Sequence, residues 1–256
     1  MPIAPAFGSP GGKSHLAPRI VKLIPKHTTY VEPYAGGAAV FWRKEPSHRE
    51  VLNDKDAEIA AAYRFLKSMT DDQFRKLKQY DWIVKKSTFL ALRNRRTKSP
   101  VERFRRFYYL NRASFAMGRT SFGPGQKGMN LKTNMGKFLK CKARLREVTI
   151  LSMDGAAVIS RYNSTGTFFY VDPPYPKRSF AGRGAQGFDE KSLYHLVTVL
   201  NKTRGKFILS LGTEHEKLLP KSLHIKKVKV RRHIVDPKTG KPIDWGYEIL
   251  AANFKI

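Results

Sequence analysis

Short apolar runs that alternate with helical patterns constrain the fold of this chain more than any other feature of its sequence. Five runs are typical of buried strands: Thr29 to Val31, Val51 to Asn53, Val148 to Met153, Thr167 to Val171 and Lys206 to Leu211. Helical patterns lie between or after them, at Pro18 to Ile24, Ala57 to Ser68 and Lys191 to Thr203. Strands that alternate with helices favour a parallel, doubly wound sheet. We therefore predict an α/β fold.

Two segments depart from this alternation. Residues 68–146 have the pattern of helices and loops, which predicts an insertion into the α/β domain. Near the end of the sequence, His224 to Asp236 and Tyr247 to Phe254 resemble strands on either side of a "PKTGKP" turn, which predicts an antiparallel hairpin closing the sheet. We therefore expect a main domain formed by residues 1–68 and 147–256, and an inserted helical domain formed by residues 69–146.

The positive charge of the chain is concentrated in the predicted insertion. The sequence carries 49 Lys and Arg against 20 Asp and Glu, and residues 85–146 alone hold 18 basic residues and a single acid. This segment contains too many large apolar side chains for a disordered tail, among them Phe89, Phe104 and Tyr108. An ordered, basic and aromatic segment is what a polyphosphate backbone attracts, so nucleic acid is the favoured partner. A membrane surface and an acidic protein stay open as alternatives.

Cysteine usage and hydropathy bear on where the protein works. The single cysteine, Cys141, excludes an internal disulfide and a cysteine-rich zinc site, and it fits a reducing compartment. No run of 18 or more apolar residues is present, so no transmembrane helix is expected. The first residues lack the continuous apolar stretch of a signal peptide. These features predict a cytoplasmic protein without a membrane partner.

Four acids stand where predicted strands end, in a chain that has few acids. They are Glu32, Asp54, Asp154 and Asp172. In open α/β sheets, ligands bind beyond the carboxyl ends of the strands. Any one of these acids has the alternative role of capping the helix that follows it. Four of them together predict a site for a ligand with hydroxyl groups, amino groups and positive charge.

Two glycine-rich segments favour a nucleoside-type cofactor over a nucleoside triphosphate. Gly36 and Gly37 follow the first strand, and Asp54 lies about twenty residues further on, where dinucleotide folds place the acid that binds ribose hydroxyls. The GxGxxG spacing is absent, so no pyrophosphate is expected. The opening segment "FGSPGGKS" ends like a P-loop, but Phe7 occupies the position of its first glycine. A P-loop also follows a strand, and six residues precede Phe7.

The segment "VDPPYP" carries the most specific chemistry. Pro173 and Pro174 directly follow a strand, which they end, so that Asp172 is held at the strand tip. The Asp172 carboxylate and the Pro173 carbonyl form an acceptor pair beside the ring of Tyr175. Such a pair suits a planar base with an exocyclic amino group, which would stack on the ring and donate two hydrogen bonds. The alternative is a rigid proline turn with a packed tyrosine.

Taken in order, these motifs resemble those of a known family. A "GGK" segment, then "VEPYAGG", then a basic insertion and then "DPPY" are arranged as in the Dam-type, alpha-group DNA adenine-N6 methyltransferases. "YLNR" at Tyr109 to Arg112 and "GFDEKSLYHL" at Gly187 to Leu196 are also similar. The resemblance covers nearly the whole chain. It implies a Rossmann-like, doubly wound methyltransferase sheet with an inserted helical target-recognition domain.

The resemblance also implies a reaction and its partners. The enzyme would move a methyl group from S-adenosylmethionine to the exocyclic N6 amine of a flipped-out adenine in double-stranded DNA, inside a bacterial, archaeal or phage-infected host cell. The sulfonium is already a strong electrophile, so no metal is expected. A monomer would suffice, and a cognate restriction endonuclease stays open as a partner. An RNA adenine methyltransferase, a catalytically idle DNA-binding protein and a cytosine-N4 enzyme are the alternatives.

Individual roles follow from the resemblance. Phe7 would pack near the cofactor, and Lys13 would contact it or pair with an acid at the strand ends. Asp54 would bind the ribose hydroxyls and Asp154 the adenine amino group of the cofactor. The whole expected cofactor set is Phe7, Gly12, Lys13, Glu32, Pro33, Tyr34, Ala35, Gly36, Gly37, Asp54, Asp154 and Asp172. The expected catalytic set is Asp172, Pro173, Pro174 and Tyr175.

The DNA contacts are expected in the basic insertion. The candidates are Arg93, Arg95, Arg96, Arg105, Arg106, Asn111, Arg112 and Arg119. Most such side chains contact phosphate, and an arginine can also recognise guanine in the major groove. The segments "NRASFAMGR" and "SLGTE" depart from the family pattern. A second basic run, Lys221 to Arg232, is either a further contact or one solvated face of a strand, and the loop after "DPPY" has the alternatives of closing over the base or lying on the surface.

Overall fold

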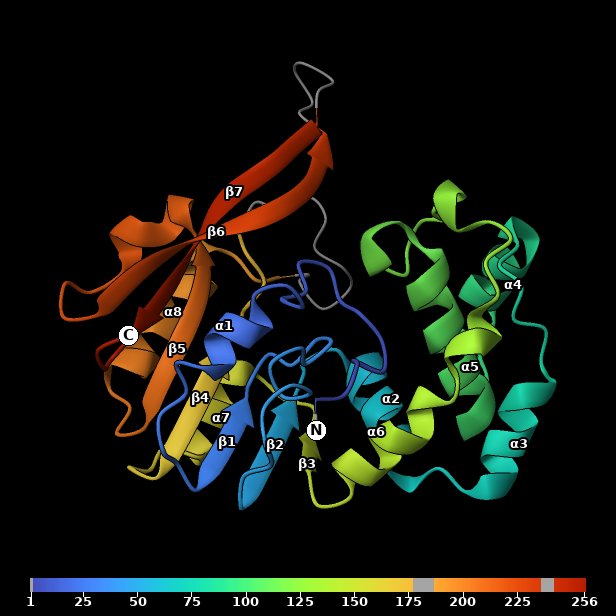
Figure 1. Cartoon of the computed structure of the whole chain (residues 1–256), viewed down its shortest axis with the longest axis horizontal. Helices are drawn as coiled ribbons and strands as arrows, with labels where there is room; N and C mark the ends of the chain where they lie inside the picture. Colours follow the sequence, from blue (N-terminus) through green and yellow to red (C-terminus); the bar gives the residue numbers. More distant parts are fainter. Residues whose placement is uncertain (1, 177–186, 236–241) are drawn as a thin grey trace.

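A seven-stranded sheet forms the centre of the computed structural model, which describes residues 2–176, 187–235 and 242–256 (Figure 1). The strands are β1 (Thr29–Glu32), β2 (Arg49–Asn53), β3 (Thr149–Leu151), β4 (Thr167–Val171), β5 (Lys206–Gly212), β6 (His224–Val235) and β7 (Pro242–Ala252). Their order in the sheet is β3-β2-β1-β4-β5-β7-β6. β1 to β5 run parallel, whereas β7 is antiparallel to both β5 and β6. The predicted α/β fold with a closing hairpin is therefore confirmed.

Alternate residues of the strands bury opposite faces of the sheet. Tyr30 and Phe168 lie in one apolar cluster, and Val31 and Phe169 lie in the other. This follows from the two-residue period of a strand, which sends successive side chains to opposite faces. The first cluster includes residues of α1 (Ala17–Val21) and α2 (Ala57–Ser68), and the second includes residues of α7 (Gly155–Arg161) and α8 (Glu190–Asn201). Helices thus cover both faces, as a doubly wound sheet requires.

The predicted insertion is helical. It contains α3 (Asp71–Gln79), α4 (Lys86–Asn94), α5 (Pro100–Ala113) and α6 (Lys137–Leu145), with 3-10 turns at Phe115–Met117, Pro124–Gln126 and Leu131–Asn134. Fully buried aromatic rings form its interior, with Phe104 stacked on Phe65 of α2 at a centroid distance of 4.7 Å. The insertion therefore shares one continuous apolar cluster with the sheet. The boundary at residues 69 and 146 remains a prediction.

Side-chain caps explain where several helices begin. Asp56, Ser99 and Asp189 each accept a hydrogen bond from a backbone N–H in the first turn of α2, α5 and α8. Thr70 and Gln73 form a reciprocal capping box at the start of α3. These residues satisfy N–H groups that have no partner within the helix.

Some predicted boundaries were wrong by a few residues. The helix predicted over Pro18 to Ile24 ends at Val21. β3 is shorter than its apolar run, because the N–H of Met153 donates to the Asn53 side chain instead of a strand. β7 begins at Pro242, earlier than predicted.

The carboxyl ends of β1, β2 and β4 meet at one edge of the sheet. Figure 1 shows the helical insertion on one side of this edge and the β6–β7 hairpin on the other. Within the described ranges, no helix is both long and apolar enough to cross a membrane. The candidate site lies at this carboxyl edge.

Candidate active site

The buried Lys13 and the half-buried Asp172 form an ion pair at the carboxyl end of β4. The Lys13 ammonium nitrogen lies 2.8 Å from Asp172 Oδ1 and 3.7 Å from Glu248 Oε2, and it donates to the Gly11 carbonyl at 3.0 Å. Burial alone lowers the pKa of Lys13, but the nearby charges of Asp172 and Glu248 outweigh it, so this pKa lies above its ordinary value. The lysine is therefore a fixed cation beside the Asp172 carboxyl group.

The two prolines and the tyrosine that follow Asp172 are held by packing. Pro173 is buried, Pro174 is half-buried and Tyr175 is 9 % exposed. The Tyr175 hydroxyl lies 3.5 Å from Ser210 Oγ, and its ring centroid lies 5.1 Å from the Lys13 ammonium. The structure thus brings the whole predicted catalytic set to one strand end. The loop after "DPPY", for which closing over the base and lying on the surface were the alternatives, runs from Pro176 to Phe188. Its residues 177–186 lie outside the described residues.

Three supporting residues were missed by the sequence analysis. Glu248 of β7 reaches Lys13, Ser210 of β5 reaches the Tyr175 hydroxyl, and the ring of His215 stands edge-on to that of Tyr175 at 6.4 Å between centroids. All three are buried. An acid inside the apolar run "YEILAANF" is the one signal that would have pointed to Glu248.

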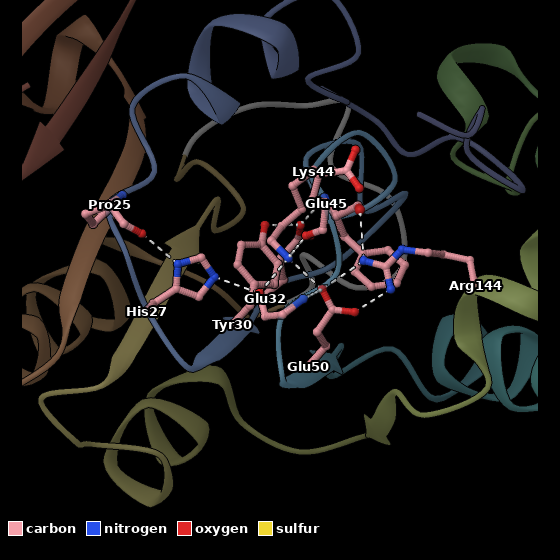
Figure 2. A network of polar contacts seen from close by, with 10 residues as sticks. Pro25, His27, Tyr30, Glu32, Lys44, Glu45, Glu50 and Arg144 are labelled. Carbon is pink, nitrogen blue, oxygen red and sulfur yellow. Dashed lines mark hydrogen bonds and ion pairs between the residues drawn. The ribbon is translucent and has the colours of Figure 1, made fainter. Parts of the chain in front are cut away.

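Glu32, predicted to face the cofactor, is buried in an interior network (Figure 2). Its Oε1 accepts hydrogen bonds from the Tyr30 hydroxyl at 2.7 Å and from the Phe41 N–H at 2.8 Å. Burial raises the pKa of Glu32 to about 8, even though these two hydrogen bonds lower it. Glu32 is therefore largely uncharged at neutral pH in the cofactor-free protein.

Figure 2 also shows the ion pairs that Glu50 forms with Lys44 and Arg144 next to Glu32. The Lys44 ammonium lies 4.4 Å from the centre of the Tyr30 ring and 2.6 Å from Glu50 Oε1, and Arg144 of α6 pairs with both oxygens of Glu50. Burial raises the pKa of Glu50, but Arg144 and Lys44 outweigh it and hold this pKa below its ordinary value. The network fastens the end of the insertion to β2 beneath the site.

We predict that Glu32→Gln stabilises the cofactor-free protein above neutral pH. The folded protein holds the Glu32 proton up to about pH 8, whereas the unfolded chain releases it near pH 4.5. The wild type therefore loses stability as the pH rises from 4.5 to 8, by an amount on the order of a few kcal/mol. Glutamine has no proton to release and can still accept both hydrogen bonds.

Chemical denaturation of both proteins at pH 5 and pH 8.5 measures this effect. The stability of the variant relative to the wild type should rise between the two pH values. An equal difference at both would show that Glu32 titrates normally.

The glycine turn after β1 packs closely against residues 7–9. A Cβ at Gly36, which has φ +48°, would lie 2.9 Å from Ser9 Oγ, and one at Gly37 would lie 3.0 Å from the Phe7 carbonyl. The turn thus requires glycine because residues 7–9 approach it closely. The N–H of Gly12 closes a turn onto the Ser9 carbonyl at 3.0 Å. The opening segment and the glycine turn therefore form one unit.

Phe7 lies in the core rather than on an open surface. Its ring is 2 % exposed and packs 4.8 Å from the rings of both Tyr63 and Phe107. Because Phe107 belongs to α5, Phe7 joins the sheet to the insertion. The expected packing of Phe7 near the cofactor remains a prediction.

Asn53, another residue missed from the sequence, holds three strand ends together. Its side-chain amide donates to the Pro33 carbonyl at 2.7 Å and to the Met153 carbonyl at 3.0 Å, and its oxygen accepts from the Met153 N–H. Its own carbonyl accepts from the Ala35 N–H at 2.8 Å. Asn53 thereby fixes the loops in which Pro33, Ala35 and Asp154 stand.

Asp54 is held next to the glycine turn by two backbone N–H groups. Its two oxygens accept from the N–H groups of Gly36 at 2.8 Å and Asp56 at 2.9 Å. Burial nevertheless raises the pKa of Asp54 to about 6, because it outweighs these two hydrogen bonds. A half-buried carboxyl group beside a glycine turn suits a pair of ribose hydroxyls.

Asp154 caps α7, which was the alternative role for an acid at a strand end. Its Oδ1 accepts from the N–H groups of Ala156 at 2.9 Å and Ala157 at 3.2 Å. The Tyr34 ring lies over Gly155, where a Cβ would come within 2.3 Å of Cζ. Burial, and to a lesser degree Asp154, raise the pKa of Tyr34 above its ordinary value. Tyr34 and Asp154 therefore share one wall of the site.

Two predicted DNA-binding arginines turn inward instead. Arg119 is 4 % exposed and pairs with Asp56 and, at 2.9 Å, with Glu58. Arg106 pairs with Glu58 at 2.5 Å and donates to two carbonyls of α4. Both arginines fasten the insertion to the start of α2. In this conformation they do not present their guanidinium groups to solvent.

The other six predicted DNA-binding residues differ from one another in exposure and in contacts. Arg96 is exposed, and Arg95 carries an exposed pair with Glu102. Arg93 donates to the Thr120 carbonyl, Arg105 lies 4.1 Å from the centre of the Tyr80 ring, and Arg112 points toward Met129. Asn111 is buried and donates to the carbonyls of Gly8 and Met117. The structure does not gather the eight residues on one surface.

A turn with unusual backbone joins the insertion to the opening segment. Ala116, Met117 and Arg119 have φ values of 46°, 61° and 62°, which side chains disfavour. The Met117 side chain lies against Gly8, where a Cβ would be 2.0 Å from its sulfur. Next to this turn, the Phe115 ring is 56 % exposed. Backbone strain of this kind concentrates at functional sites, and only the departure at "NRASFAMGR" hinted at it.

The described part of the chain contains no group of three or more His, Cys, Asp or Glu that could hold a metal ion. The polar groups at the carboxyl edge are instead carboxylates, backbone N–H groups and one ammonium. They match a ligand that presents hydroxyl and amino groups.

Comparisons with known proteins agree with this chemistry. The model of the D12 class N6 adenine-specific DNA methyltransferases matches residues 9–234. The chain is 26 % identical over 217 residues to the type II methyltransferase M.CviBI of Paramecium bursaria Chlorella virus NC1A, covering 79 % of this chain and 80 % of that protein. It is 25 % identical over 248 residues to a DNA adenine methylase of Vibrio cholerae, covering 88 % and 87 %. It is 27 % identical over 234 residues to the modification methylase LlaI of Lactococcus lactis, covering 80 % of this chain and 36 % of that protein.

Proposed function

The chain belongs to the D12 class N6 adenine-specific DNA methyltransferase family, and from this premise we propose that Asp172, Pro173 and Tyr175 hold the target adenine. The enzyme transfers a methyl group from S-adenosylmethionine to the N6 amine of adenine in DNA. One observation carries the assignment of residues: the Lys13–Asp172 pair, 2.8 Å long, at the carboxyl end of β4. It holds the Asp172 carboxyl group in place where a strand ends in two prolines.

The acceptor pair orients the amine. The Asp172 carboxylate and the Pro173 carbonyl accept its two N–H groups, which aims the nitrogen lone pair away from them. Asp172 also stabilises the positive charge that grows on the nitrogen as the N–C bond forms and the C–S bond breaks. The adenine must leave the duplex first, at a cost of a few kcal/mol. Contact with the Tyr175 ring and the two hydrogen bonds offset this cost.

The cofactor side of the site fits S-adenosylmethionine. We assign Asp54 to the ribose hydroxyls and Asp154 to the adenine amino group of the cofactor, with Tyr34 and the glycine turn beside them. The carboxylates and N–H groups described above are the donor and acceptor types that these groups need. The cofactor supplies an electrophilic methyl group, so orientation accounts for most of the protein's contribution.

We predict that cofactor binding weakens as the pH falls below about 6. Only ionised Asp54 can accept from both ribose hydroxyls while keeping its bonds to Gly36 and Asp56. With a pKa of about 6, the fraction of ionised Asp54 falls about tenfold per pH unit below that value, and the Kd should rise in proportion.

Isothermal titration with S-adenosylmethionine from pH 8 to pH 5 measures this, with Asp54→Asn as the control. The cofactor's own groups titrate identically with both proteins, so their difference isolates Asp54. The variant should bind more weakly at pH 8 and show a flatter profile. Parallel profiles would exclude Asp54 from cofactor binding.

We assign the DNA contacts to the insertion, residues 69–146, and the cofactor and adenine to residues 1–68 and 147–256. The exposed Arg95 and Arg96, with Arg93, Arg105 and Arg112, supply cations for phosphate. Asn111, Arg106 and Arg119 act indirectly, since they join the insertion to Gly8 and α2. The exposed ring of Phe115 is an additional candidate for contact with DNA bases.

The names of two relatives bear on the biological setting of the enzyme. These names, a type II methyltransferase and a modification methylase, support a role beside a cognate restriction endonuclease. We place the enzyme in the cytoplasm of a bacterial, archaeal or phage-infected cell, where its DNA substrate lies, and propose that it acts as a monomer. Size-exclusion chromatography with light scattering, with and without DNA, tests the monomer directly.

A further inference from the structure

The outer face of the β6–β7 hairpin combines aromatic and basic side chains. Trp245 and Tyr247 of β7 are 55 % and 53 % exposed, and Lys229 of β6 is paired in register with Tyr247. The Lys229 ammonium lies 4.8 Å from the centre of the Trp245 ring. Lys227, two residues before Lys229, lies on the same face by the alternation of the strand. These four residues are called the hairpin face.

Protection of a sheet edge accounts for only part of this face. β6 is the edge strand, and lysines on an edge strand discourage pairing with other chains. That role explains Lys227 and Lys229 but gives no reason for two large aromatic rings exposed on the neighbouring strand. Rings beside cations are the combination that binds nucleic acid, because cations neutralise phosphates and rings pack on sugars and bases.

β7, which carries Trp245 and Tyr247, also contributes Glu248 to the candidate active site around Lys13 and Asp172. Glu248 stands between Tyr247 and Ile249 in sequence, so its side chain points to the opposite face, where it lies 3.7 Å from the Lys13 ammonium. Lys13 in turn contacts Asp172. The hairpin and the insertion rise on the two sides of the carboxyl edge (Figure 1). A duplex whose adenine reaches Asp172 therefore has the hairpin beside it. The hairpin face lies on the side of β7 opposite Glu248, so it is the flanking part of a longer duplex that can reach it.

We propose that the hairpin face binds the sugar-phosphate backbone of the DNA substrate, outside the bases that the enzyme recognises. This rests on the proposed function for the choice of substrate. Lys229 supplies a cation next to the Trp245 ring, and Lys227 is held by an exposed pair with Glu216 at 2.8 Å that a phosphate can replace. The contact is independent of sequence and adds affinity for longer duplexes.

The charge of the face is tested by the salt dependence of DNA binding. Lys227→Gln/Lys229→Gln keeps a polar edge and should lower the slope of log Kobs against log salt by about 1.8, since each neutralised phosphate contributes about 0.9. Lys202→Gln/Arg204→Gln is the matched control, because it removes two exposed cations just before β5, at the amino end of the parallel strands and away from their carboxyl ends. Its slope should equal that of the wild type.

The aromatic part is tested with duplexes of about 12 and 36 base pairs that carry the mapped target. Trp245→Ala/Tyr247→Ala should raise KM several-fold on the long duplex and leave kcat and the short duplex unchanged. Unchanged slopes and KM values for both double variants would overturn the inference and leave an acidic protein as the occupant of the face. If the wild type binds DNA with a slope that depends on Lys227 and Lys229 but methylates no duplex, the proposed function fails while this inference stands.

Discussion

Asp172→Ala should reduce methyl transfer by a factor on the order of 10³ or more, while duplex DNA binding stays close to that of the wild type. The variant loses both the acceptor for the adenine amine and the charge that stabilises the developing cation on the nitrogen. DNA affinity depends mainly on phosphate contacts made elsewhere. Transfer of labelled methyl groups to unmethylated genomic DNA measures the rate without knowledge of the target sequence.

Two controls keep this result interpretable. Asp172→Ala leaves Lys13 with Glu248 as a partner, so the fold should survive, and circular dichroism with thermal melting verifies it. Glu147→Ala removes an acid that is 84 % exposed, next to β3, and should leave the rate unchanged. Methyl transfer by a folded Asp172→Ala protein at more than a tenth of the wild-type rate would remove Asp172 from the site.

Arg119→Met should destabilise the protein by about 3–5 kcal/mol. The substitution leaves Asp56 buried without its guanidinium partner and removes one of the two arginines that contact Glu58. Loss of one member of a buried pair costs more than loss of both. Urea denaturation measures the free energy of unfolding directly.

A double-mutant cycle separates this pairing from a role in DNA recognition. Asp56→Asn/Arg119→Met should recover part of the lost stability, because no charge then stays buried without a partner. Arg119→Met with wild-type stability but altered sequence preference would instead support the direct DNA contact expected for Arg119 from the sequence.

The sheet could be predicted because its signals are local. Each buried strand shows as an apolar run, and an acid or a proline marks the end of β1, β2 and β4. The meeting of Asp54 and Asp172 at one edge followed from the rule that parallel strands end together. Asp172 and its prolines needed no tertiary information, because proline ends a strand wherever the strand lies.

The partners of buried charges could not be predicted in this way. Arg119 and Arg96 lie in the same basic region of the sequence. Only the fold brings Arg119 into contact with Asp56, the N-cap residue of α2, which lies 63 residues earlier in the chain. Glu248 reaches Lys13 across most of the chain for the same reason. Asp154 shows a further limit, since a strand-end acid that caps a helix and one that faces a ligand have identical sequence signals.

The identity of the methylated nucleoside distinguishes adenine-N6 methylation of DNA from its alternatives. The protein would be incubated with methyl-labelled S-adenosylmethionine and unmethylated double-stranded DNA, with RNA as a parallel substrate, and the products digested to nucleosides. We predict label in N6-methyladenine from DNA and none in RNA. Label confined to RNA, or recovered from DNA as N4-methylcytosine, would contradict this prediction.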